Sequence, residues 1–325
     1  MSTFDATDKP VRRSLAGRRT RFGDLLLEGV AGAATAGALI LVGLIAYKIV
    51  QGARLSVSTF GLGFLTHVGW DPVHNQFGAA VFLFGTAVTS IGALLLATPL
   101  ALGVALFLTE LAPSWIRGPV TALVETLAAI PSVVIGLWGI LVLGPVLREH
   151  VMPFLHSTLG FIPLFGPVTT GTSVFTAIVV LTLMILPIIS SISRELFLGV
   201  PSELKEAALG LGTTRWEMVR GVIFPYARGG VAAAMILGLG RAVGEAIAVS
   251  MVIGAATTGI HWNLFDAGNA IAAQLANDYS NATPGLWTSS LFYLALILLL
   301  FSLLVNLLAQ MIVRRVARRQ GLATR

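Results

Sequence analysis

Cysteine is absent from the 325-residue sequence, and charged residues are scarce. Without cysteine the chain cannot form disulfides, thiolate metal sites or a thiol nucleophile. Charged residues make up 11% of the sequence, whereas an ordinary soluble protein has about 25%. With a mean hydropathy of +0.88, the chain is too apolar for a surface that meets water on all sides. These values exclude a soluble globular domain and a disordered chain, and they indicate an integral membrane protein.

The sequence also lacks the motifs of common nucleotide-binding and catalytic sites. It contains no Gly-x-x-x-x-Gly-Lys-Ser/Thr motif, and its lysines, Lys9, Lys48 and Lys205, lie in other contexts. No His-Glu-x-x-His motif occurs, and no set of Ser, His and Asp residues is expected to meet in one compartment. We therefore expect no cofactor, no metal site and no catalytic centre in this chain, and transport becomes the leading class of function.

Six hydrophobic stretches are long enough to cross a bilayer, which takes about 20 residues of helix. They run over 29–50, 79–109, 119–144, 171–193, 229–254 and 286–312. Because an open sheet edge cannot face lipid, each stretch is expected to be helical. The predicted fold is an all-α membrane protein with six transmembrane helices.

The basic residues indicate how these helices are oriented. An even number of spans places both termini on the same side of the membrane. If that side is the cytoplasm, all 21 Lys and Arg residues except Lys48, Arg54, Arg148 and Arg241 lie in or beside inner segments, as the positive-inside rule requires. The prediction is a basic cytoplasmic tail at 1–28, a transmembrane domain at 29–312 and a basic C-terminal tail at 313–325. The net charge of +6 then reflects orientation in the membrane, and no nucleic-acid partner is needed to explain it.

The longest inner segment between spans, residues 195–228, is expected to fold as two short helices. Ser202 is a predicted N-cap, with Glu203 and Glu206 in the first turn of the helix that follows. This helix is expected to stop near Gly210 and Gly212.

A second short helix is predicted over 213–223, ended by Pro225. The first helix carries an apolar stripe that includes the small residues Ala207 and Ala208, the other members being Leu204 and Leu211. The stripe fits either an amphipathic helix lying in the membrane interface or a knob that docks into the groove of a soluble partner.

The fifth stretch carries two opposite charges. If the hydrocarbon begins near Val231, Arg241 lies about 15 Å deep at a rise of about 1.5 Å per residue, near the midplane. Glu245 follows one turn later, so both side chains are expected on one face of a continuous helix, where they can pair. The arrangement fits either a structural ion pair or an anion site, because a guanidinium matches a tetrahedral oxyanion and a carboxylate can accept a hydrogen bond from a protonated oxyanion such as hydrogen phosphate.

Prolines interrupt three of the stretches. Pro99, Pro131 and Pro187 each remove a backbone hydrogen bond and are expected to kink or weaken the helix. Pro131 and Ser132 together could present free carbonyls and a hydroxyl to a transport cavity.

The inner loop resembles a known motif. Glu206-Ala207-Ala208, followed by Gly212 and then by Val222-x-Phe224-Pro225, is similar to the EAA loop of bacterial ABC importer permeases, whose pattern ends in Ile-x-Leu-Pro. The resemblance implies the type I ABC importer permease fold and a location in the bacterial cytoplasmic membrane. It also implies that the loop couples to a separate ATPase subunit through a set of residues that comprises Glu203, Glu206, Ala207, Ala208 and Gly212.

A second resemblance concerns the spans. The run from Gly240 to Gly254, together with the third span from Glu125 to Ile140, is similar to the PstC type of phosphate-specific permease subunit. It implies that Arg241 and Glu245 are needed to transport phosphate. One departure is Ala246, where many relatives have Thr. The implied partners are a PstA-like permease subunit, two PstB-like ATPase subunits that bind ATP and Mg²⁺, and an external PstS-like phosphate-binding protein.

Other functions remain open from the sequence. An importer of sulfate, molybdate or tungstate would need similar charges, since the short motif with Arg241 and Glu245 does not fix the anion. An ATP-independent anion carrier or channel would not need a coupling loop, so the loop argues against this alternative. A scaffold that reports phosphate status to a membrane kinase could coexist with transport.

Overall fold

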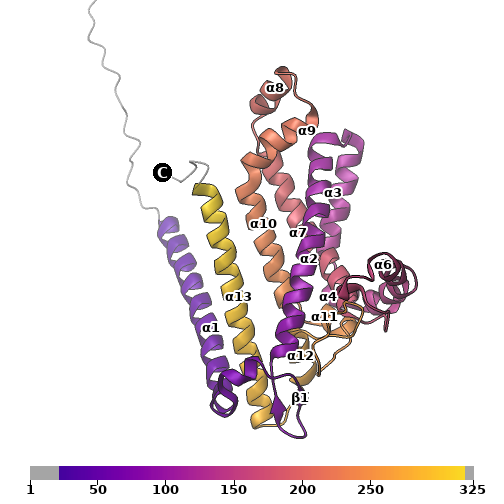
Figure 1. Ribbon diagram of the computed structural model, residues 1–325. Coiled ribbons are helices and arrows are strands. Elements are labelled where there is room, and N and C mark those ends of the chain that lie inside the picture. The colour runs from indigo at the N-terminus through magenta and orange to yellow at the C-terminus, as the bar shows by residue number, and fades with distance from the viewer. Residues whose placement is uncertain (1–21, 319–325) are drawn as a thin grey trace, which may run out of the picture. The chain divides into compact units, whose positions relative to one another are not determined.

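The computed structural model describes residues 22–318, and the predicted tails lie mostly outside this range. The α-helices are α1 Phe22–Phe60, α2 Ala80–Leu106, α3 Ser114–Ala129, α4 Ser132–Trp138, α5 Gly144–Val146, α6 Met152–Leu159, α7 Val174–Leu198, α8 Ser202–Gly210, α9 Arg215–Met218, α10 Phe224–Gly244, α11 Ile247–Val252, α12 Ile271–Asp278 and α13 Leu286–Arg318 (Figure 1). π-Helical turns occupy Phe107–Leu111, Gly139–Leu143, Leu147–Val151 and Val219–Ile223, and 3₁₀ turns occupy Gly61–Leu65 and Pro163–Phe165.

Six helical segments among the described residues are candidate membrane spans, as predicted, but their boundaries differ from the predicted ones. The helical segments long and apolar enough to cross are Gly23–Leu65, Ala80–Leu111, Ser132–Leu159, Val174–Leu198, Arg215–Gly244 and Leu286–Met311. In the described range the fold is all-helical except for a short hairpin of β1, Trp70–Asp71, and β2, Gln76–Phe77. In its turn, hydrogen bonds from the side chain and backbone of His74 lower the pKa of Asp71.

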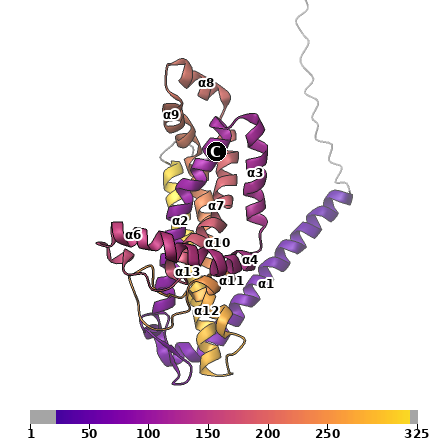
Figure 2. The ribbon, with the colours of Figure 1, turned by 90° about the vertical axis from the view of Figure 1, so that its right-hand side faces the viewer.

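The third predicted span, 119–144, is wrong as a continuous helix. Ile130 is extended, with φ −65° and ψ 128°, because the residue before a proline is pushed out of the helical region. The chain therefore leaves α3 and begins α4 at Ser132. The helical run from α4 to α6 then lies crosswise to α2 and α7 (Figure 2).

The chain divides into two units, with the boundary after Lys48. The described part of the first unit is the apolar N-terminal portion of α1. In the second unit α7 is central, because 67% of its most apolar window is buried, against 28% or less for the other candidate spans.

Helix α2 packs closely against α7 through small residues. Ala93, Ala97 and Ala101 recur every fourth residue and are fully buried, so the two backbones can approach as in small-x-x-x-small helix pairs. The hydroxyl of Thr182 on α7 donates to the carbonyl oxygen of Ala93 at 3.4 Å. Helix α10 packs into the same core through Ala234 and Ala242.

The loop before α12 docks onto α2. A Cβ placed on Gly85 would lie 1.7 Å from the carbonyl oxygen of Asn269, so the two backbones touch at this point. The backbone N–H of Ile271 donates to the hydroxyl of Thr86 at 2.9 Å. The side chain of Asn269 is buried and donates to Gln274 at 2.8 Å. These contacts fix the loop that follows α11.

Candidate functional site

The fifth predicted span, 229–254, is interrupted at its charged residues. Helix α10 ends at Gly244, and Glu245 is extended, with φ −73° and ψ 116°. The carboxylate of Glu245 accepts a hydrogen bond from the backbone N–H of Ala248 at 3.2 Å, which satisfies one free donor at the start of α11. The helix is thus interrupted here, and Glu245 caps α11 instead of continuing α10.

The predicted pairing of Arg241 with Glu245 is wrong, because it assumed a continuous helix. Arg241 lies in the last turn of α10, and its side chain is exposed when the chain is considered alone. The side chain of Glu245 is half-buried. In the described part of the chain, no acidic side chain forms an ion pair with Arg241. The guanidinium is therefore open to a ligand or to another subunit.

A polar residue that the sequence reasoning missed lies beside Arg241. A Cβ on Gly240 would lie 3.8 Å from the side-chain oxygen of Asn306 on α13, so α10 and α13 meet next to the arginine. Asn306 is one of two amide residues, with Gln310, in the apolar run 291–312, and polar residues in membrane helices face the bundle interior or a cavity. An amide inside this apolar run was the signal that could have identified it.

Helices α4 and α11 run parallel and bring Ser132 and Glu245 to the same end of the pair. A Cβ on Gly136 would lie 2.9 Å from the Cα of Ala248, and a Cβ on Gly139 would lie 2.9 Å from the side chain of Val252. Both helices therefore advance in the same direction. Ser132 precedes Gly136 by one turn, as Glu245 precedes Ala248 by nearly one turn.

The start of α4 presents free backbone donors. Pro131 occupies the cap position and gives no side-chain hydrogen bond. In the described range no backbone carbonyl accepts from the N–H groups of Ser132 or Val133, and the first bonded N–H groups are those of Val134 and Ile135, which reach the carbonyl oxygen of Pro131. Ser132 itself is half-buried. Donors of this kind favour a negatively charged or carbonyl ligand.

The inner loop forms the two predicted helices, with two corrections. Ser202 is the first residue of α8, and Pro201 occupies the cap position without a side-chain hydrogen bond. Pro225 does not end the second helix, because the chain continues from α9 through a π-turn into α10. A wider turn accommodates the missing N–H and the ring of the proline.

Most of the α8 surface points away from the membrane helices. Glu203, Glu206 and Ala207 are exposed, whereas Ala208 is half-buried against Phe197 and other apolar residues. The predicted apolar stripe is therefore divided between two faces. After α8 the exposed side of the loop includes Leu211, which is 86% exposed, and Trp216, which is 64% exposed.

The turn between α8 and α9 depends on one glycine. Gly212 has φ +83°, a left-handed conformation that favours glycine. The hydroxyl of Thr213 donates to the carbonyl oxygen of Ala208 at 2.8 Å, and Thr214 and Glu217 form a reciprocal capping box at the start of α9. These bonds set the direction in which α8 projects.

We expect Gly212→Ala to loosen this turn by about 1–2 kcal/mol, the strain of a left-handed alanine. Gly210→Ala is the matched control, because Gly210 ends α8 with no heavy atom within 4 Å of an added Cβ. Hydrogen exchange of the backbone amides in α8 and α9 measures the effect. Equal exchange rates in the two variants would contradict the assignment of the turn to Gly212.

An ion pair joins α8 to the π-turn that follows α2. The ammonium of Lys205 lies 2.7 Å from a carboxylate oxygen of Glu110, and the two side chains are only 19% and 15% exposed. The same ammonium also donates to the carbonyl oxygen of Phe197 at 3.3 Å. The sequence reasoning missed this pair, because 95 residues separate its members.

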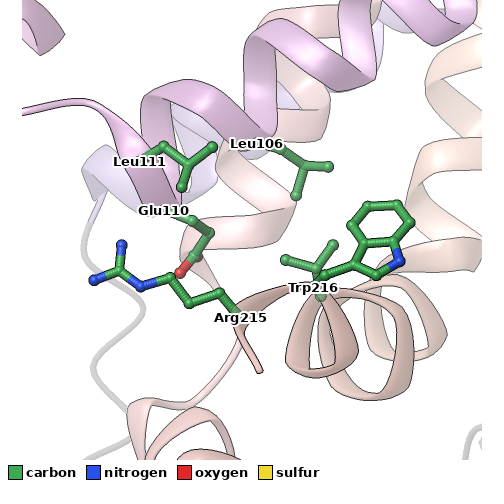
Figure 3. Close-up of a pocket in the computed structure, with 6 residues that line it drawn as sticks. Leu106, Glu110, Leu111, Arg215 and Trp216 are labelled. Atoms are coloured by element: carbon green, nitrogen blue, oxygen red, sulfur yellow. The ribbon is translucent and has the colours of Figure 1, made fainter. Parts of the chain in front are cut away.

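Glu110 also lines a cavity of about 270 Å³ between the end of α2 and α9. Figure 3 shows Leu106, Glu110 and Leu111 on one side and Arg215 and Trp216 on the other. The ion-pair partner of Glu110 is Lys205 and not Arg215. Among the described residues, the π-turn that ends α2 and the loop of α8 and α9 thus meet through a charged contact beside an apolar pocket.

Comparisons with known proteins agree with this architecture. Residues 97–318 match the family model described as binding-protein-dependent transport system inner membrane component. The chain is 42% identical to the phosphate transport system permease protein PstC of Mesorhizobium japonicum, over 88% of each chain. It is 43% identical to PstC of Pasteurella multocida, over 81% of this chain and 83% of the relative. It is 41% identical to PstC 2 of Mycobacterium tuberculosis, over 90% and 93%.

Solved structures support the fold. A bacterial alginate ABC transporter chain matches 92% of this chain with a TM-score of 0.59 and 16% identity, over 98% of that chain. A chain of the MetNI methionine ABC transporter matches 73% of this chain with a TM-score of 0.51 and 22% identity, over 94% of that chain. The protein is thus a multi-pass inner membrane component and a permease subunit. It belongs to the family of binding-protein-dependent transport system inner membrane components, and within that family to the PstC permease proteins.

Proposed function

We propose that the chain is one of two membrane subunits of an ATP-driven importer that moves inorganic phosphate into the cytoplasm. The observation that carries this proposal is Arg241, a cation inside an apolar span that is exposed on this chain and has no carboxylate partner among the described residues. The PstC relatives that are 42% and 43% identical to this chain are named as phosphate transport permeases. If this chain has the same anion specificity, the unpaired guanidinium of Arg241 is the group that would bind the transported phosphate.

The position of Arg241 favours a side chain that faces a transport pathway and not the lipid. An arginine inside a membrane span is costly when it faces lipid, and the cost reaches about 2.5–3.5 kcal/mol or more at the centre of the bilayer. Such a residue is stable when it faces water or another subunit, so the exposed side of α10 is proposed to line a cavity shared with a second, PstA-like permease chain. In that cavity the fixed donors of the guanidinium match a tetrahedral oxyanion.

Glu245 and Ser132 complete the proposed site. Both lie at the same end of the α4–α11 pair, close in sequence to the breaks that interrupt the third and fifth spans. The free N–H groups and hydroxyl at Ser132 can donate to phosphate oxygens. The carboxylate of Glu245 can accept from a protonated anion such as hydrogen phosphate. Sulfate and molybdate carry no such proton at neutral pH, which favours phosphate over these alternatives.

The inner loop is proposed to couple transport to ATP hydrolysis. The surface with Glu203, Glu206 and Ala207 is exposed, Ala208 anchors the helix, and Gly212 sets the turn. This geometry suits a short helix that inserts into a cleft of a PstB-like ATPase subunit, which would hold ATP and Mg²⁺. Together with the match to importer chains, it supports a type I importer fold with both termini cytoplasmic and alternating access as the mechanism. An external PstS-like protein would deliver phosphate.

The test is uptake by the complex reconstituted in vesicles, with labelled phosphate, sulfate, molybdate or tungstate and with or without ATP. We expect ATP-dependent accumulation of phosphate, with little competition from the other three anions. Accumulation of another oxyanion in its place would overturn the substrate but keep the coupling. Uptake without ATP would overturn the coupling and favour a carrier or channel.

A further inference from the structure

The contact between Lys205 and Glu110 has features that separate it from an ordinary surface ion pair. Its atoms are 2.7 Å apart and both side chains are more than four-fifths buried. The ion pair at the inner end of α7, Arg194 with Glu195, joins neighbouring residues, and its carboxylate side chain is 70% exposed. That second pair ties no elements together, whereas the first ties α8 to the end of α2.

Helix α8 has few other attachments to the membrane helices. In the described range none of its residues is fully buried. Ala208 makes an apolar contact with the cluster around Phe197. Lys205 provides the polar attachment, with one bond to Glu110 and one to the carbonyl oxygen of Phe197. A displacement of α8 therefore acts on the membrane domain through the side chains of Lys205 and Ala208, in addition to the chain segments that join α8 to α7 and α9.

Glu110 lies at a point from which movement can reach the core. It belongs to the π-turn that ends α2, and π-turns occur often at functional sites. From there the buried alanines of α2 pack against α7, and α7 packs against α10, which carries Arg241. These are contiguous, closely packed elements of the kind that carry coupling between distant sites.

We propose that the ion pair of Lys205 and Glu110 transmits movement of the coupling helix α8 to α2 during transport. The inference rests on the proposed function, in which α8 contacts the ATPase. Lys205 and Glu110 are positioning residues that act on the anion site through the packed helices. A charge pair suits this role because removing one partner leaves an uncompensated, partly buried charge, so the two elements move together.

The experiment measures phosphate imported per ATP hydrolysed by the reconstituted complex. The variants are Glu110→Gln, Lys205→Gln and the exchange Glu110→Lys with Lys205→Glu, and Glu195→Gln is the matched control that removes a carboxylate from the exposed pair. We expect each single variant to lower the ratio about 5-fold or more, and the exchange to restore it to within about 2-fold, as coupled residues do in double-mutant cycles. The control should keep the wild-type ratio.

The ratio separates transmission from structural damage. A purely structural role would reduce the amount of assembled complex, and uptake and ATP hydrolysis would fall together with the ratio unchanged, which would overturn the inference. If a single variant fails to assemble, the exchange variant decides, because an assembled exchange variant that stays uncoupled would also overturn it. Failure of the wild-type complex to import phosphate would instead contradict the proposed function itself.

Discussion

Replacing Arg241 with alanine is expected to reduce ATP-dependent phosphate uptake by about 100-fold or more, since loss of a charged hydrogen-bonding partner of a desolvated anion costs about 3 kcal/mol. The side chain is exposed on this chain and forms no ion pair with any described residue. Its removal should therefore leave the fold and the ATPase contact intact. Uptake is measured in vesicles that contain equal amounts of assembled complex.

Two further variants sharpen this test. Arg241→Lys keeps the charge but loses the planar pair of donors, so its uptake should lie between those of the wild type and the alanine variant. Arg228→Ala removes an exposed arginine from the first turns of the same helix and should leave uptake unchanged. Wild-type uptake by a fully assembled Arg241→Ala complex would contradict the anion site.

The largest effect on stability is expected from Gly85→Ala. The added Cβ would lie 1.7 Å from the carbonyl oxygen of Asn269, so two backbones must separate. Over-packing of this kind costs about 3 kcal/mol or more when the obstacle cannot move. The obstacle here is the loop that follows α11, which the buried hydrogen bond of Asn269 holds in place.

The control for Gly85 lies in the same helix. Gly103 has no heavy atom within 4 Å of an added Cβ, so Gly103→Ala should be neutral or stabilise α2 by up to about 1 kcal/mol through its better helix propensity. Thermal unfolding of the purified chain in detergent compares the two variants. A similar midpoint for both would show that the loop adjusts freely, against the close contact described at Gly85.

The sequence predicts the membrane-crossing elements well because each one is a long apolar run. The inner loop is equally visible, since Pro201, the glycines and the charged first turn mark the ends of α8. These features depend on local physical chemistry. The two short strands escaped prediction because they consist of two residues each and owe their pairing to a tight turn.

The interruptions of the third and fifth spans could be foreseen only in part. Pro131 is a local signal for a break, and the predicted kink became a full change of direction. The break at Glu245 has no such signal. It depends on a carboxylate finding the N–H of Ala248 and on α11 packing against α4, a contact between residues far apart in the sequence.

The charged contact of Lys205 with Glu110 was hidden for the same reason. Each residue by itself reads as an ordinary charge near the inner membrane surface. Only the return of the chain after α7 brings them together, and no spacing rule connects positions on separate helices. Arg241 likewise has no ion-pair partner among the described residues because α10 ends at Gly244, before Glu245.

The crosswise run that begins at α4 also constrains how the protein is made. The α4 face with Gly136 fits against Ala248, which emerges from the ribosome much later. Synthesis of the roughly 110 residues between them takes about 5–20 s at usual rates. Throughout that interval the segment after Pro131 has no permanent neighbour on that face. The packing of this face against Ala248 is therefore a late event in biogenesis, possible only after the fifth span has been made.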